Sequence, residues 1–99
     1  MKVTISDAAE TDLREIGDYI GKHNPARAET FVNDLLDSAY GLGKNPKAYP
    51  LIPNFEDREV RRKVHGDYLI LLRIDPQQVT VLHILHGARD YASLMFPED

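Results

Sequence analysis

Two neighbouring segments in the second half of the chain are apolar on both faces that a strand presents, and this feature limits the possible folds most. They are "DYLILLRID" at 67–75 and "VTVLHILH" at 79–86, joined by a turn around "DPQQ". Strands of this kind occupy the centre of a sheet, where both faces are covered. The preceding "REVRRKVH" at 58–65 alternates with period two and ends at the turn pair "GD", which predicts a third strand nearer the edge.

The first half of the chain has the spacing of two amphipathic helices. After a short strand at "KVTI" (2–5), Ser6 or Asp7 is suited to cap a helix over residues 8–22. Asn24 and Pro25 then predict a second helix that starts at once and stops before Gly43, so the pair forms an antiparallel hairpin. The expected buried stripes are Ala9, Leu13, Ile16 and Ile20 in the first helix and Ala28, Phe31, Val32, Leu35, Ala39 and Leu42 in the second.

These elements predict a single α+β domain over residues 1–99, with an N-terminal strand and an antiparallel helical hairpin packed on a mainly antiparallel sheet that ends in a three-stranded meander. A two-helix hairpin covers only one face of such a sheet. The second face is therefore expected to stay exposed as a docking strip for a partner peptide or subunit. The alternative is that residues 44–57, with three prolines and several large apolar side chains, fold back as its cover. The residues expected in the docking strip are Leu69, Leu71, Arg73, Leu82 and Ile84.

Charge is divided unevenly along the chain, although the net charge is only −4. Residues 7–37 hold eight acidic and three basic side chains, whereas residues 58–89 hold six basic and three acidic ones, including Arg61, Arg62 and Lys63. A basic patch of this density attracts an acidic partner or a phosphate backbone. The alternative is an edge strand whose charges prevent unwanted pairing.

Cysteine is absent from the chain, which excludes disulfides and thiolate metal sites. No apolar run is long enough to span a bilayer, and the N-terminus has no signal-peptide pattern. We therefore expect a soluble cytoplasmic protein that has no membrane partner.

Two histidines in the last strand are the first candidates for chemistry. His83 and His86 are three residues apart, so they point to opposite faces of a strand and do not form a joint metal site. We expect neither a metal nor a cofactor. Hydrolysis of RNA would need a proton-transfer pair and cations beside the phosphate. The residues available for a nuclease are Arg61, Arg62, His86, Arg89 and Tyr91, and their spacing does not make them converge.

Five segments in the same order resemble toxins of the RelE/ParE superfamily of type II toxin–antitoxin systems, and specifically its ParE branch. They are "DLREIGDYI" (12–20), "NPARAETFVNDLLD" (24–37), "LGKNPKAYP" (42–50), "EVRRKVHGDYLILLRI" (59–74) and "VLHILHGARD" (81–90). The resemblance covers nearly the whole chain, and it implies the same fold of a helical hairpin on an antiparallel sheet.

The resemblance also implies partners and an activity. A ParD-like antitoxin would dock a helix and an extended segment along the hairpin and sheet, and the resulting hetero-oligomer would bind operator DNA through the antitoxin. The residues of the docking strip would then be the antitoxin-binding residues: Leu69, Leu71, Arg73, Leu82 and Ile84. ParE-type toxins poison DNA gyrase by holding its cleaved-DNA intermediate, without catalysis by the toxin. Target-binding residues would be Arg61, Lys63 and Arg89.

The RelE branch instead cleaves mRNA on the ribosome and uses a late aromatic acid or base. The tail "ASLMFPED" departs from that pattern, because Phe96 cannot transfer a proton and Tyr91 stands too early in the chain. We therefore expect a non-enzymatic gyrase toxin. The alternatives are a RelE-type mRNA endonuclease and an inactive toxin that retains only antitoxin binding.

Overall fold

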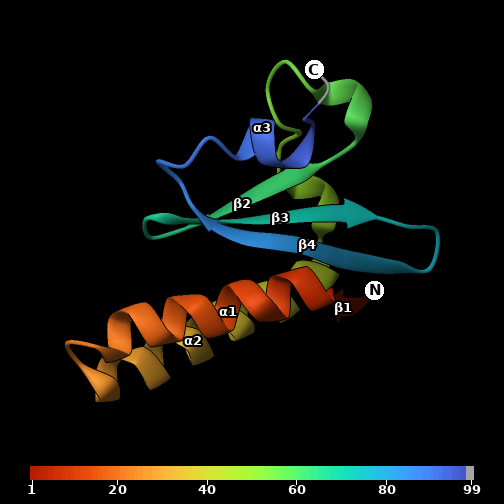
Figure 1. Cartoon of the computed structure of the whole chain (residues 1–99). Helices are drawn as coiled ribbons and strands as arrows, with labels where there is room; N and C mark the ends of the chain where they lie inside the picture. Colours follow the sequence, from red (N-terminus) through yellow and green to blue (C-terminus); the bar gives the residue numbers. More distant parts are fainter. Residues whose placement is uncertain (98–99) are drawn as a thin grey trace.

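A four-stranded sheet lies on a pair of long helices in the computed structural model, which describes residues 1–97 (Figure 1). The strand order is β1-β4-β3-β2, with β1 parallel to β4 and the other pairs antiparallel. The expected α+β fold is confirmed, with β3 and β4 in the centre. The elements are β1 (Lys2–Ile5), α1 (Asp7–Gly21), α2 (Pro25–Tyr40), β2 (Arg61–His65), β3 (Tyr68–Ile74), β4 (Gln78–His86), α3 (Tyr91–Met95) and the short 3-10 turns η1 (Gly41–Lys44), η2 (Pro46–Ala48) and η3 (Glu56–Arg58).

The two long helices begin where the sequence places their caps. The Ser6 hydroxyl accepts a hydrogen bond from the Ala9 amide, and the Asn24 side chain accepts one from the Arg27 amide. The predicted third strand starts later than expected, at Arg61, because residues 56–58 form η3 and Glu59 adopts a left-handed conformation with φ of 58°. None of the helices within residues 1–97 is long and apolar enough to cross a membrane.

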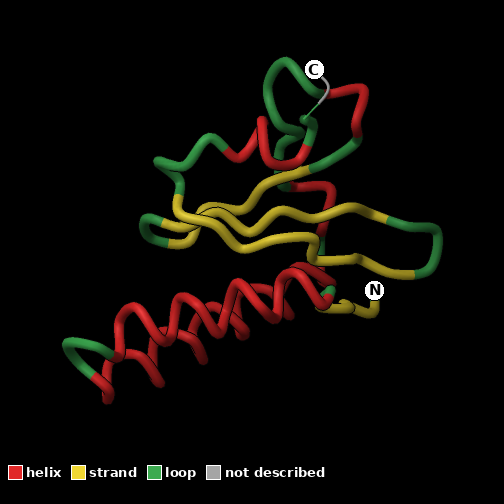
Figure 2. Tube along the Cα trace, viewed as in Figure 1, coloured by secondary structure: helices red, strands yellow, loops and turns green. Residues whose placement is uncertain are grey.

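One face of the sheet packs on the helical hairpin and forms the larger core. Figure 2 shows the helix pair along one side of the strands. The buried members of this core include six residues of the predicted helix stripes and alternate residues of β3 and β4; they are Ala9, Leu13, Ile16, Leu35, Ala39, Leu42, Ile70, Leu72, Val79, Val81 and Ile84. Of the other predicted stripe residues, Ile20, Phe31 and Val32 are partly buried against this core, whereas Ala28 is not part of it.

A β-bulge in β4 changes which residues of that strand face the hairpin. Leu71 pairs with His83 and Leu72 pairs with Val81, so Leu82 is an extra residue opposite β3. Val81 and Ile84 therefore both lie in the hairpin-side core, whereas Leu82 faces the other side. The expectation that Leu82 and Ile84 share one face is wrong, because a period-two pattern does not reveal an inserted residue.

Polar side chains from the start of α1 hold this bulge. The Ser6 hydroxyl donates to the Leu82 carbonyl at 2.9 Å, and the Asp12 carboxylate accepts from the Ile84 amide at 2.9 Å. The same Asp12 oxygen lies 2.9 Å from Nδ1 of His83. These contacts pair the Leu82 carbonyl and the Ile84 amide, and they tie α1 to the centre of the sheet.

The second face of the sheet is covered by the chain itself, so the prediction that this face stays exposed as a docking strip is wrong. Figure 1 shows α3 and the segment before β2 on the side opposite α1 and α2. Leu71 is fully buried and Leu69 is 7% exposed. The alternative interpretation, in which residues 44–57 fold back as a cover, holds in part, with α3 and Phe96 supplying the rest. This second core consists of Ile52, Val60, Leu69, Leu71, Leu85 and Phe96, with Phe55, Leu82, Tyr91 and Met95 packed against it.

Candidate functional site

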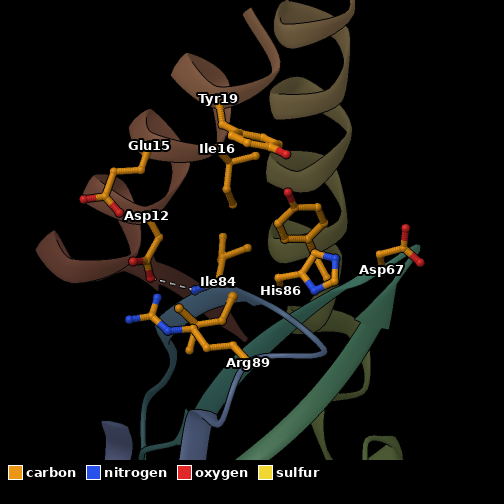
Figure 3. A pocket seen from close by; sticks show the side chains of 10 residues that line it. Asp12, Glu15, Ile16, Tyr19, Asp67, Ile84, His86 and Arg89 are labelled. Carbon is orange, nitrogen blue, oxygen red and sulfur yellow. Dashed lines mark hydrogen bonds between the residues drawn. The ribbon is translucent and has the colours of Figure 1, made fainter. Parts of the chain in front are cut away.

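A cleft of about 500 Å³, here called the end cleft, lies between α1 and the ends of β3 and β4. Figure 3 shows Glu15 and Tyr19 on α1 across from His86 and Arg89, which come from the end of β4 and the segment after it. Asp67 marks the other limit of the cleft. The structure thus brings together two residues of the predicted functional set, because His86 ends β4 and Arg89 lies in the segment that follows it.

A close backbone contact shapes this end of the sheet. The Gly87 amide donates to the Asp67 carbonyl at 2.7 Å, and a Cβ on Gly87 would lie only 3.2 Å from that oxygen. The Arg89 amide then donates to the His86 carbonyl at 3.0 Å, which turns the chain and leaves the Arg89 side chain exposed at the rim. These contacts bend the chain at Gly87 and place Arg89 at the rim of the end cleft.

Among residues 1–97, the end cleft contains no histidine or tyrosine that is well placed to act as a general base. Nδ1 of His86 accepts a hydrogen bond from the Ala88 amide at 3.1 Å, so the lone pair of a neutral ring is already used. Tyr68 packs edge-on against this ring at 5.3 Å. Burial, and then the charges of Tyr19 and Asp67, raise the pKa of Tyr68 above its usual value, so this phenol stays protonated at neutral pH.

The other nuclease candidates lie elsewhere. Arg62 donates to the phenol oxygen of Tyr91 at 3.0 Å on the α3 side of the sheet. Arg61 points to the opposite side and donates to the Tyr49 carbonyl at 2.8 Å. The five residues named from the sequence therefore fall into three separate places, in the end cleft, beside α3 and beside η2.

Two of the three predicted target-binding cations make contacts within the chain. Lys63 donates to the Ser38 carbonyl of α2 at 2.9 Å, and its ammonium lies 5.3 Å from the centre of the Tyr49 ring. Arg61 holds the loop at Tyr49 in the same region. Sequence reasoning missed these roles because the acceptors are backbone carbonyls, which leave no residue pattern. Arg89 is the member of this set that is exposed.

The predicted antitoxin-binding residues differ sharply in exposure. Leu69, Leu71 and Ile84 are buried, so a partner cannot touch them unless the covering segments move. Arg73 is exposed and Leu82 is half-buried, so both remain accessible on the α3 side of the sheet. The error has a physical reason: the covering side chains come from a proline-rich segment and a short C-terminal helix, neither of which has a periodic apolar pattern.

A second concave surface, missed from the sequence, runs along the outer side of the helical hairpin. This hairpin groove has a volume of about 730 Å³, with Gly17, Ala28, Val32 and Leu36 among its lining residues and Tyr40 at one end. Tyr40 is 57% exposed, so its ring is available for contact with a partner. The sequence feature that could have predicted this groove is the width of the apolar stripe on the second helix, which is broader than a single contact with the sheet requires.

Metal ligands are not gathered in the described part of the chain. Residues 1–97 contain no group of three or more His, Cys, Asp or Glu side chains placed to hold a metal ion.

The comparisons with known proteins identify the family. A family model described as the ParE toxin of the type II toxin–antitoxin system, parDE, matches residues 3–91. The chain belongs to the ParE toxin family of type II toxin–antitoxin systems. The resemblance found in the sequence is thereby confirmed for this ParE-family toxin. No curated relative matches it in sequence.

Solved structures share the fold of this ParE-family toxin. A chain of the chromosomal ParDE system from P. aeruginosa superposes with a TM-score of 0.75 at 18% identity, covering 87% of this chain and 95% of that one. A chain of the toxin–antitoxin complex RelBE2 from Mycobacterium tuberculosis superposes with a TM-score of 0.63 at 22% identity, covering 86% and 95%. At such identities the likeness concerns the fold.

Proposed function

We propose that this ParE-family toxin inhibits DNA gyrase by holding the cleaved-DNA intermediate, and that it catalyses no reaction itself. The observation that carries the proposal is the separation of the groups that RNA cleavage would need together. His86 uses its acceptor nitrogen on the Ala88 amide, while Tyr91 and Arg62 bond to each other at another place. A binding toxin has no need of such convergence, and the ParE branch that the sequence resembles implies gyrase as the target.

Arg89 is the side chain we assign to target contact. It is exposed at the rim of the end cleft, and no carboxylate within residues 1–97 forms a salt bridge with it. Replacing a guanidinium that contacts a charged partner weakens binding by about tenfold. The variant Arg89→Ala should therefore need about tenfold more toxin for the same effect on gyrase.

The test incubates the purified chain with gyrase, ATP and supercoiled plasmid, and measures linear DNA after the protein is digested. Linear DNA that depends on the toxin and declines in Arg89→Ala supports the proposal. The matched control is Arg14→Ala, which removes an exposed arginine from α1 whose Nη2 bonds to Thr11 at 3.2 Å. Absence of linear DNA together with cuts in ribosome-bound mRNA would reject the proposal in favour of an endonuclease. Absence of both activities would indicate an inactive toxin.

We further propose that a ParD-like antitoxin docks an amphipathic helix in the hairpin groove. The second face of the sheet is sealed by the chain itself, whereas this groove is open, with Leu13, Val32 and Leu36 among its lining residues and Tyr40 exposed at its end. An exposed aromatic residue beside an apolar groove is typical of the anchor positions of helix-in-groove binding.

The antitoxin proposal is tested by co-expressing the short reading frame next to the toxin gene and measuring the affinity of the complex. Tyr40→Ala should weaken the complex by about tenfold or more, because aromatic anchors commonly contribute over 1 kcal/mol. Tyr19→Ala is the matched control, since Tyr19 is 67% exposed but lies in the end cleft. Equal affinity of both variants and the wild type would exclude the groove as the antitoxin site.

A further inference from the structure

A third concave surface, on the α3 side of the sheet, collects cations beside apolar side chains. This arginine pocket has a volume of about 500 Å³, and its lining residues include Arg58, Arg73, His83, Leu82, Leu94 and Phe96. None of the lining residues within 1–97 is acidic. The pocket is distinct from the end cleft and from the hairpin groove, because it shares no lining residue with either.

The fold brings the two arginines into this pocket from separate segments. Arg73 extends the face of β3 that carries Leu69 and Leu71, and its side chain is exposed beyond the buried part of that face. Its Nη2 lies 3.5 Å from the Arg58 carbonyl. The Arg58 guanidinium lies 5.2 Å from the centre of the Phe96 ring, with its Nε 3.7 Å from Asp57.

The charge of these groups selects an anionic ligand. Nδ1 of His83 lies 2.9 Å from a carboxylate oxygen of Asp12, so this ring already has a partner within the chain. Arg73 forms no salt bridge with an acidic side chain within residues 1–97. A guanidinium presents donors in a planar fork that fits a carboxylate or a phosphate.

The apolar part of the pocket favours a peptide over a nucleic acid. Leu94 is 42% exposed and lies beside Leu82 and Phe96, so an apolar side chain next to the anion would be covered. The Phe96 ring already stacks on Phe55 at 4.9 Å and carries the Arg58 guanidinium, which leaves little room for base stacking. A polyanionic backbone would also approach a chain of net charge −4, with Asp7 and Glu10 in the first turn of neighbouring α1.

We propose that the arginine pocket docks a partner peptide segment in which a carboxylate side chain stands next to an apolar one. The carboxylate bonds to Arg73, and the apolar side chain packs on Leu82 and Leu94. This inference rests on the proposed function in one respect, since the antitoxin is the partner that would supply such a segment. The pocket lies apart from the hairpin groove, so one antitoxin could use both.

The test needs neither antitoxin nor gyrase, so its failure and the failure of the proposed function are distinguishable. The probes are the tripeptide acetyl-Leu-Glu-Phe-amide, its glutamine counterpart acetyl-Leu-Gln-Phe-amide, and hexauridylate. Each is titrated into the isotope-labelled full chain, and the backbone amide signals of Leu82 and Leu94 are followed by NMR. The glutamate peptide should shift these signals at about tenfold lower concentration than the glutamine peptide.

The variant Arg73→Gln should remove this preference for glutamate, while Arg27→Gln, the same change at an exposed position of α2 outside all three concave surfaces, should keep it. Equal binding of the two peptides to the wild type would overturn the proposal even if Arg73→Gln did not fold. Unchanged preference in a folded Arg73→Gln protein would overturn it as well. If hexauridylate shifted the same signals at lower concentration than the glutamate peptide, the proposal would be overturned in favour of a nucleic-acid ligand.

Discussion

The contact between Asp12 and the β4 bulge should be among the most important single polar interactions in this fold. One carboxylate oxygen of Asp12 accepts from the Ile84 amide and lies against His83, and the Asp12 side chain is only 12% exposed. Ile84 itself is 1% exposed, so its amide has no access to bulk water as a substitute partner. We predict that Asp12→Ala destabilises the protein strongly without changing any apolar packing.

The expected magnitude follows from these contacts. A buried amide left without an acceptor costs about 1–3 kcal/mol, and the lost hydrogen bond to His83 adds about 1 kcal/mol. The second figure is kept small because the His83 ring is 25% exposed and therefore partly solvated. Asp12→Ala should lower the free energy of unfolding by about 2–4 kcal/mol, which for a domain of this size lowers Tm by roughly 8 °C or more.

Asp12→Asn should cost less, about 1 kcal/mol, because the amide oxygen still accepts from Ile84 but carries no charge. The assay is equilibrium unfolding in urea followed by circular dichroism, with hydrogen exchange of the Ile84 amide as a local readout. The matched control is Asp18→Asn, the same change at an exposed position of the same helix, which should stay within about 0.5 kcal/mol of the wild type. Equal stability of Asp12→Ala and the control would refute the argument.

Three further outcomes follow from the packing. Phe96→Ala should lower the free energy of unfolding by about 3 kcal/mol and increase binding of a hydrophobic dye, because Phe96 seals the second core. Gly43→Ala should cost about 1–3 kcal/mol in urea unfolding, because its Cβ would collide with the carbonyl of the first residue and displace β1. Acidification should fray α3, which would shift the Ser93 amide signal in NMR. Hydrogen bonds from the Ser93 side chain and backbone lower the pKa of Asp90, the residue that caps α3. The cap is therefore complete above a pH of about 4, and it is lost as the pH falls through the lowered pKa of Asp90.

Each of these outcomes has a control. Phe96→Leu should retain most of the seal, so a loss as large as in the alanine variant would contradict the packing argument. Gly41→Ala should be tolerated, because the nearest atom to its Cβ is the flexible end of Lys63 at 3.9 Å. Asp90→Asn should remove the acid-dependent change at Ser93, and persistence of that change would show that another group causes it.

The candidate sites were predictable from the sequence only in part. His86 and Arg89 share the end cleft because His86 is the last residue of β4 and Arg89 lies three residues further on, but their spacing alone did not predict this convergence. The internal contacts of Arg61 and Lys63 were not predictable, since their partners are carbonyls of distant segments. The arginine pocket was equally hidden, because Arg58 and Arg73 meet only after η3 folds against β3.

The sequence alone determined the four strands and the two long helices, and the order in which they follow one another along the chain. Local hydrogen bonds fix the helix starts at Ser6 and Asn24, and the two continuous apolar runs require central strands, so short-range chemistry was sufficient. Only the tertiary structure decided what covers the second face and which way β4 turns its side chains. The cover depends on irregular segments meeting the sheet across long stretches of chain, and the bulge at Leu82 depends on partners supplied by α1. Neither the cover nor the bulge produces a periodic pattern of apolar residues, because each is stabilised by contacts between residues far apart in sequence.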